Sequence, residues 1–267
     1  MASTDPLILL PPSEGKTPGG EGSSWGSGTM AVDLDSRRSQ VAAALNRAMR
    51  ASASDRQKLL GVKGDALAAA TAADRSVLES PTLAAIERYS GVLYGALEPW
   101  TLGAPTRRRL DRCVLVFSGL WGLVAPSDPI PDYKLKMGAS LPGLGKLSTW
   151  WRPAIDEALG LRLAGRRRVV WNLLPKEHDA AWSGIPDDSQ HRVVSVRFLE
   201  PGRAGALVAV SHWNKFLKGA LVRFLLENPG ADLDDLDGWR HPSGFVLDPS
   251  RTVVQGPRKE LSLVRAP

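Results

Sequence analysis

The sequence VFSGLWGLVAPSDPIPDYKLKM, residues 116–137, begins in an apolar segment and becomes a proline-rich loop. The apolar segment, Cys113 to Phe117, predicts a buried strand. Gly122 and the prolines at 126, 129 and 131 are expected to prevent a return to regular helix or sheet and to stiffen the path. A stiff loop that leaves a buried strand can present side chains to a ligand, although a crossover that only covers the sheet is the alternative. The side chains that this loop offers are Asp128, Asp132, Tyr133, Lys134 and Lys136.

The composition is typical of a globular protein of the cytoplasm. Of the 267 residues, 43% are hydrophobic and 23% are charged, and no repeat or long linker divides the chain, so a single domain over residues 1–267 is expected. No apolar run reaches the roughly 18 residues that a membrane span needs, and the N-terminus lacks the pattern of a secretory signal. The single cysteine, Cys113, cannot form an internal disulfide and is expected to be buried and inert.

The charge balance favours a polyanionic partner. The formal net charge is +6, and arginines cluster at 107–109 with Arg112 and again at 166–168. Such clusters bind nucleic acid by releasing its counterions. A solvated basic face, or the composition of a GC-rich genome, would produce the same pattern.

Polar residues follow the first predicted strand, Leu7 to Leu10, in the sequence PPSEGKTP at 11–18. The spacing of glycine and lysine does not fit a Walker A phosphate loop, which argues against hydrolysis of nucleoside triphosphates. Glu14 and Lys16 remain candidates for an ion-paired acid and base just beyond a strand end, where ligands gather in α/β sheets.

A second polar group follows the predicted strand at 166–174. Lys176, Glu177 and His178 come directly after Pro175, and His178 is the most plausible general base among the four histidines. A lone histidine is more often structural, so that alternative stays open. No spacing of His, Cys and carboxylate residues suggests a metal site.

The segment from Leu59 to Ala70 has the pattern of a helix-hairpin-helix element. Gly61 and Gly64 bracket a tight turn between two helical segments, and the amides that open the second helix can point at a phosphate. Lys63 would add a positive charge at the tip. The alternative is a plain corner between helices, in which Asp65 caps its own helix.

The remaining periodicities predict further helices and strands. Helices are expected at 35–50 with Ser36 as the cap, at 80–89 with Ser80 as the cap and Pro81 in the first turn, and at 106–112. Two more are expected at 147–159, with Trp150 and Trp151 mostly inward, and from Ser211 to Glu227 with a basic outer face. Strands at 193–198 and 206–210 should pair across a Pro-Gly turn, and the segment at 244–248 should form one more strand before a C-terminal tail.

Five motifs, in the same order along the chain, resemble the YaaA peroxide-stress-resistance family. They are LLPPSEGK at 9–16, the tyrosine-glycine segment at 89–95, SGLWGLVAPSDPIPDYKLKM at 118–137, VVWNLLPKEH at 169–178 and KGALVRFL at 218–225. The resemblance implies a mixed α/β (α+β) fold, with a single compact domain whose central mixed sheet is surrounded by helices and which contains a helix-hairpin-helix element at about 55–73. Lys136 stands where the family often has glutamate, and His178 where a tyrosine is usual.

The resemblance also implies a function, namely binding to duplex or distorted DNA and protection against oxidative damage. It assigns the hairpin role to Gly61, Val62, Lys63 and Gly64, and the arginine clusters, notably Arg107 and Arg108, would hold further phosphates. On this hypothesis the protein is a cytoplasmic monomer that needs no cofactor.

A second hypothesis is an enzyme that cleaves the glycosidic bond of a damaged base, a nucleoside or a nucleotide. Its site would form where the loops at 11–16, 126–137 and 175–178 converge, and Lys16 or Lys176 could form a Schiff base. Its candidate catalytic residues are Glu14, Lys16, Tyr133, Lys134, Lys176 and Glu177. A third hypothesis is a scaffold that binds protein partners.

Overall fold

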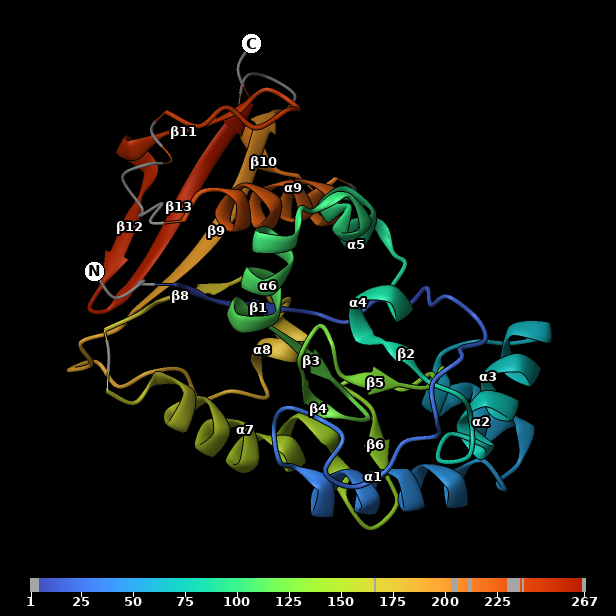
Figure 1. Ribbon diagram of the computed structural model, residues 1–267. Coiled ribbons are helices and arrows are strands. Elements are labelled where there is room, and N and C mark those ends of the chain that lie inside the picture. Colours follow the sequence, from blue (N-terminus) through green and yellow to red (C-terminus); the bar gives the residue numbers. More distant parts are fainter. Residues whose placement is uncertain are drawn as a thin grey trace.

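A mixed sheet runs through the computed structural model, which describes residues 5–165, 167–202, 206–210, 213–229, 236 and 238–265 (Figure 1). In this part of the chain the strand order is β11-β13-β9-β8-β1-β3-β4, with β10 also paired to β9 and β12 to β13. The five strands from β13 to β3 in this order are mutually parallel, and the other four are antiparallel to their neighbours. The strands are β1 (Leu7–Leu10), β3 (Val114–Ser118), β4 (Gly122–Val124), β8 (Val169–Asn172), β9 (Arg192–Pro201), β10 (Leu207–Ala209), β11 (Phe245–Leu247), β12 (Val253–Gln255) and β13 (Arg258–Arg265).

Helices cover the sheet, with α5, α6 and α9 above the central strands in the view of Figure 1 and α7 below them. Two small ribbons, β2 (Leu83–Ala84) with β5 (Pro129–Ile130) and β6 (Ser140–Leu141) with β7 (Gly145–Lys146), lie outside the main sheet. The helices are α1 (Asp35–Ala48), α2 (Ala53–Leu60), α3 (Asp65–Arg75), α4 (Ala85–Arg88), α5 (Val92–Leu97), α6 (Ala104–Cys113), α7 (Leu147–Leu163), α8 (Lys176–Asp179) and α9 (Asn214–Glu227). The expected single α/β domain with a central mixed sheet is confirmed.

The central parallel strands were predictable because both of their faces are covered. Every residue of β1 and of β3 is buried, and parallel strands of this kind appear in a sequence as continuous apolar runs. Cys113 ends α6 instead of opening β3, and its thiol is buried and free, as expected. Burial raises the pKa of this thiol to about 11, which keeps it protonated and unreactive.

The chain does return to the sheet after Gly122, contrary to the expectation. Residues 122–124 form β4, which pairs antiparallel with β3. Gly122 has a φ of +69°, a value that glycine adopts without strain, and a Cβ there would lie 2.8 Å from the Trp151 ring. Glycine therefore permits this tight hairpin, and the prolines act only beyond it.

The helix expected at 80–89 is wrong. Thr82 forms an isolated bridge with Gly22, the next two residues form β2, and only the single turn of α4 follows. The helical signals of Ser80 and Pro81 are overridden by pairing with segments distant in sequence.

The expectation of a C-terminal tail is also wrong, because residues 258–265 form the strand β13. This strand pairs in parallel with β9 over seven register positions, and Leu261 and Leu263 are buried. The charged residues at the ends of RKELSLVR obscured the alternation that is typical of a strand. The strand lies within the sheet, between β9 and β11.

Several element boundaries differ from the expected ones. Ser36 lies inside α1, which begins without a side-chain cap, and α7 continues to Leu163 with Trp151 fully buried and Trp150 partly so. β8 starts only at Val169, and the expected strand start at Arg166 lies outside the described residues, as does Ser211 before α9. The strands expected at 193–198 and 206–210 do pair, as β9 and β10.

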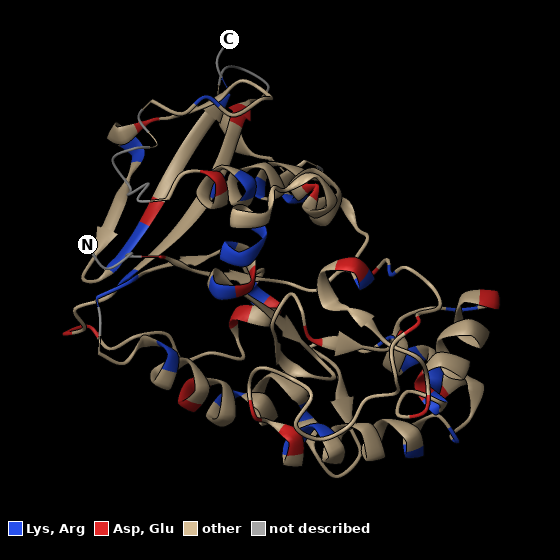
Figure 2. Ribbon diagram, in the orientation of Figure 1, with Lys and Arg blue, Asp and Glu red and all other residues tan. Residues whose placement is uncertain are grey.

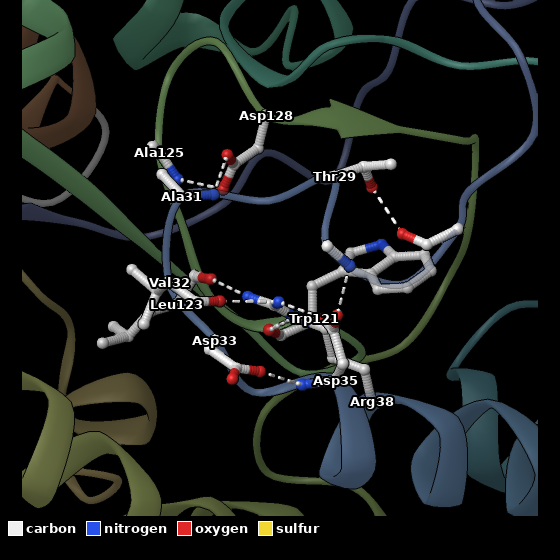
Figure 3. Close-up of polar contacts among 12 residues, drawn as sticks. Thr29, Ala31, Val32, Asp33, Asp35, Arg38, Trp121, Leu123, Ala125 and Asp128 are labelled. Carbon is white, nitrogen blue, oxygen red and sulfur yellow. Dashed lines mark hydrogen bonds and ion pairs between the residues drawn. The ribbon is translucent and has the colours of Figure 1, made fainter.

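Asp128 fixes the proline-rich loop in place (Figure 3). The sequence analysis had named it among the side chains that the loop could present to a ligand. Asp128 is 3% exposed, and its two carboxylate oxygens accept hydrogen bonds from the Ala31 and Ala125 amides, both at 2.7 Å. With both oxygens occupied by the backbone, Asp128 is a structural residue, and the suggestion that it faces a ligand is wrong.

Arg38 of α1 fixes the same region from within the core (Figure 3). Its guanidinium, 0% exposed, donates to the carbonyls of Trp121 at 3.1 Å, Leu123 at 2.9 Å and Val32 at 2.7 Å, and to Asp35 at 2.8 Å. One buried cation therefore joins the β3–β4 hairpin to the segment that enters α1.

Arg88 plays a similar part behind the first polar loop. Its fully buried guanidinium donates to the carbonyls of Thr17, Pro81 and Ile130. It thereby holds three loops together, one of which contains Lys16. Across the described residues, no helix combines the length and apolarity needed to cross a bilayer.

Candidate functional site

A pocket of about 380 Å³ lies where the parallel strands β1 and β8 end. Its lining comes from residues 11–16, 91–94, 133–136, 175, 177 and 178, and from Lys215 of α9. The carboxyl ends of parallel strands meet at one edge of a sheet, and ligands bind there in open α/β folds. The volume is within the range of about 300–1,000 Å³ that is typical of small-molecule sites.

Five of the six candidate catalytic residues line this pocket, and Lys176 does not. Glu14, Lys16, Tyr133, Lys134 and Glu177 are among its lining residues. Lys176 lines a separate cavity together with Trp182 and Arg258. Pro175 is the N-cap of the one-turn helix α8, so neighbouring residues there point in different directions.

Lys16 is held in the pocket lining by hydrogen bonds of the residues on either side of it and by its own ammonium group. The Thr17 amide donates to the Arg88 carbonyl at 2.8 Å, and the Ser90 amide donates to the Gly15 carbonyl at 3.2 Å. The Lys16 Nζ donates to the Ser13 carbonyl at 3.1 Å and lies 4.3 Å from the centre of the Tyr133 ring. Burial, only partly offset by the charge of Asp132, lowers the pKa of Lys16 to about 8.

Tyr133 is part of a chain of buried hydroxyl groups. Its hydroxyl lies 2.7 Å from the Ser118 hydroxyl and 2.9 Å from that of Tyr89, and Ser118 accepts from the Trp121 amide at 3.0 Å. Burial raises the pKa of Tyr133 to about 12, so the phenol stays neutral at physiological pH. Tyr133 therefore supplies a ring face to Lys16 and a neutral hydroxyl to the chain.

Glu14 sits at the exposed side of the pocket among ammonium groups. Its carboxylate lies 3.4 Å from the Lys134 Nζ and 4.0 Å from the Lys136 Nζ. Burial acts to raise the pKa of Glu14, but the charges of Lys134, Lys136 and Lys215 outweigh it and leave the pKa below its ordinary value. Glu14 is thus ionised at neutral pH.

Among the lining residues that follow β8, Glu177 is hydrogen-bonded to the backbone and His178 is not. The Gly138 amide donates to Glu177 Oε1 at 2.8 Å, and a Cβ at Gly138 would lie 3.0 Å from that side chain. The two ring nitrogens of His178 are buried and have no hydrogen-bond partner among the described residues. Burial lowers the pKa of His178 to about 4, so it is neutral at pH 7 and too weak a base to fit the proposed role well.

Asp74 of α3 is buried behind the pocket, where it contacts the backbone of Lys134, and the sequence reasoning missed it. Its side chain is 0% exposed, one oxygen accepts from the Lys134 amide at 2.8 Å, and the other has no partner in the described part of the chain. The available signal was its spacing, because Leu67, Ala70 and Thr71 are the other buried positions of the same helix. A carboxylate on that face is unusual and indicates a special environment.

The ionisation of Asp74 should set a pH dependence of stability. Burial raises its pKa to about 7, whereas the unfolded chain loses the proton at about 4. The contribution of protonated Asp74 to the free energy of unfolding is fully present below the pKa that Asp74 has in the unfolded chain. It is lost as the pH rises through the folded pKa of about 7. We expect Asp74→Asn to stabilise the protein relative to wild type by an amount that grows by about 3 kcal/mol from pH 4 to pH 7 and levels off above about pH 8.

Thermal unfolding at several pH values would measure this effect, with Asp65→Asn, at the exposed start of the same helix, as the control. A stabilisation that is independent of pH, or an equal response from Asp65→Asn, would contradict the assignment to Asp74.

The glycine-flanked turn joins α2 to α3 at the rim of the pocket. Gly61 and Gly64 have φ values of +67° and +59°, Val62 is half-buried and Lys63 is exposed. A Cβ on Gly61 would lie 3.4 Å from the Lys136 Nζ, so this lysine connects the turn to the pocket.

The two arginines assigned to DNA lie elsewhere. Arg107 is paired with Glu87 at 3.3 Å, and Arg108 is exposed on α6, away from α2 and α3 (Figure 1). Figure 2 shows Lys and Arg on elements throughout the molecule, interspersed with Asp and Glu. Within the described residues, no group of three or more His, Cys, Asp and Glu side chains could hold a metal ion.

The basic outer face expected for α9 is only partly free. Lys215 is exposed and lines the pocket. Lys218 donates to the Leu173 carbonyl at 2.9 Å, and Arg223 pairs with Glu227 at 3.0 Å and with Glu98 at 3.5 Å. Lys215 is therefore the α9 cation placed to meet a ligand of this site.

The fold and the pocket define a mixed α/β protein with a lysine-rich pocket at the carboxyl ends of its parallel strands. The sequence profile of the family described as peroxide stress protein YaaA matches residues 7–251, and the chain belongs to that family. A UPF0246 protein of Streptomyces coelicolor is 38% identical over 223 residues, 82% of either chain. One of Corynebacterium glutamicum is 32% identical over 251 residues, 91% of this chain and 94% of its own.

Proposed function

We propose that the protein binds DNA, duplex or distorted, as a cytoplasmic monomer and so limits oxidative damage under peroxide stress. The observation that carries the proposal is the position of the α2–α3 turn beside the lysine-rich pocket. The turn presents the exposed Lys63 between two glycines, and Lys136 links it to the pocket rim. A positively charged surface that continues from a helix start into a pocket suits a phosphate backbone with one nucleotide displaced from it.

The proposal assigns the phosphate contacts to the turn instead of to the arginine clusters. Lys63 and the amides that open α3 from Gly64 onward would hold the backbone, and Lys136 would hold the adjacent phosphate. Arg107 is already paired with Glu87 and is less suited to this role. Arg108 would contribute only to the long-range field that attracts DNA.

Salt and charge reversal at Lys63 test the proposal. Binding of a fluorescent duplex should weaken steeply as salt rises, because each phosphate contact releases counterions. Lys63→Glu should lower the affinity about fivefold to tenfold with little dependence on sequence, and should reduce the salt slope by about one. Lys146→Glu, an equal charge change at an exposed position on β7, is the control. An unaffected Lys63→Glu variant, or binding that is insensitive to salt, would rule out the turn.

A second candidate, an enzyme that acts on a damaged or abasic nucleotide, is favoured by Lys16. This amine lines the pocket, lies on the face of Tyr133, and has its pKa lowered to about 8 by burial. The uncharged amine of Lys16 would attack the C1′ aldehyde of an open-chain sugar, and loss of water would leave an imine. Lys176, the other candidate for this reaction, lines a different cavity.

A further inference from the structure

The pocket holds more positive than negative side chains. Lys16, Lys134, Lys136 and Lys215 line it, against the two carboxylates of Glu14 and Glu177. One oxygen of Glu177 accepts a hydrogen bond from the Gly138 amide at 2.8 Å. Glu14 is the carboxylate that pairs with Lys134 and Lys136 and is influenced by the charge of Lys215.

The contacts of Glu14 are long, and the side chain is loosely held. Its oxygens lie 3.4 Å from Lys134 and 4.0 Å from Lys136, and the side chain is 67% exposed. Charge-assisted hydrogen bonds between ammonium and carboxylate are normally about 2.7–2.9 Å. Lys134, by contrast, is only 18% exposed, and its backbone amide is fixed on Asp74 at 2.8 Å. Lys134 is therefore held in place, while the carboxylate beside it is free to leave.

The walls beside this charged end are apolar and aromatic. Pro11, Leu93, Tyr94 and Leu135 line the pocket, and Tyr94 is fixed by a 2.8 Å hydrogen bond from its hydroxyl to the Pro11 carbonyl. A flat base can pack on such walls while an attached anion reaches the lysines. Lysine binds phosphate as a compact point charge, and several lysines around one position suit a dianion.

We propose that Lys134, Lys136 and Lys215 form a subsite for the phosphate of a nucleotide, and that Glu14 occupies this subsite until the phosphate displaces it. That the ligand is a nucleotide rests on the proposed function. The phosphate belongs either to a free nucleoside monophosphate or to the terminus of a DNA strand, and both sources present the same group to the lysines. Glu14 competes with the ligand and so sets its affinity.

Calorimetry with deoxyadenosine monophosphate, deoxyadenosine and inorganic phosphate tests the subsite. We expect the monophosphate to bind at least about tenfold more tightly than the nucleoside. Glu14→Gln should tighten monophosphate binding about fivefold because it removes the competing charge, and Lys134→Met should weaken it about tenfold. Lys146→Met should have no effect, and thermal unfolding of each variant would confirm that it folds.

Binding of single-stranded DNA with and without a 5′-phosphate, compared with binding of the free monophosphate, identifies the source of the phosphate. A preference for the phosphorylated strand over the free monophosphate assigns the subsite to DNA ends, and the reverse assigns it to free nucleotides. Equal binding of nucleoside and monophosphate, or weaker binding by Glu14→Gln, would overturn the proposal. Lys63→Glu separates it from duplex binding, since that variant should show the reduced duplex affinity and keep its affinity for the monophosphate.

Discussion

Replacing Arg38 with methionine is expected to destabilise the protein by about 4 kcal/mol, which corresponds to a fall of about 10 °C in Tm. The guanidinium is fully buried and satisfies three backbone carbonyls and Asp35. Methionine fills a similar volume but donates no hydrogen bond, so the acceptors of Trp121 and Leu123 would be left unpaired in the core. This loss should exceed that of any surface substitution in the chain.

Arg47→Met is the matched control, because Arg47 lies on the exposed side of the same helix. It should change the free energy of unfolding by less than about 0.5 kcal/mol. Chemical denaturation of both variants would measure the difference. Equal effects of the two substitutions would show that the Arg38 network contributes little to stability and that α1 is held by its apolar face alone.

The sequence predicted the central strands well because burial on both faces leaves a continuous apolar run. β1 and β3 appear in this way, and so does the core of β8. β13 was missed because only its central residues are buried and its ends carry charges. The helix expected at 80–89 failed for another reason, since its residues pair with Gly22 and with β5 and so respond to distant segments.

Buried charges were the main gap in the fold prediction. Arg38, Arg88 and Asp128 have the composition of surface residues, and nothing in their local spacing says that loops will wrap around them. Asp128 lies in a loop that was expected to display its side chains, yet both of its oxygens are used by the backbone. A polar residue in a stiff loop can stabilise that loop by binding its backbone as readily as it can bind a ligand.

The candidate site was more predictable because strand order places it. Polar residues that follow two parallel strands must lie at the same edge of the sheet, and this rule brought Glu14, Lys16 and Glu177 into one pocket. The rule does not resolve neighbouring residues, so Lys176 was assigned wrongly to this pocket. It also says nothing of Asp74, which reaches the site from a helix outside the sheet.

Lys16→Met is expected to abolish reductive trapping on an abasic DNA strand, if the protein has lyase-like chemistry. The uncharged amine forms an imine with the sugar aldehyde, and borohydride then transfers hydride to the imine carbon to give a stable secondary amine. With a pKa of about 8, roughly one Lys16 in ten is uncharged at pH 7, against fewer than about one in a thousand for an ordinary lysine. Trapping by the wild type should therefore rise with pH and level off above about 8.

Lys218 provides the control that separates a low pKa from access to the pocket. Burial also lowers its pKa to about 8, but its ammonium donates to the Leu173 carbonyl and it is not among the residues that line the pocket. Lys218→Met should therefore trap as wild type does, whereas Lys16→Met should show a loss of more than about tenfold. A wild-type yield that keeps rising toward pH 10 would indicate an ordinary surface lysine. Trapping that survives Lys16→Met would remove Lys16 as the nucleophile and assign the imine to another amine of the protein.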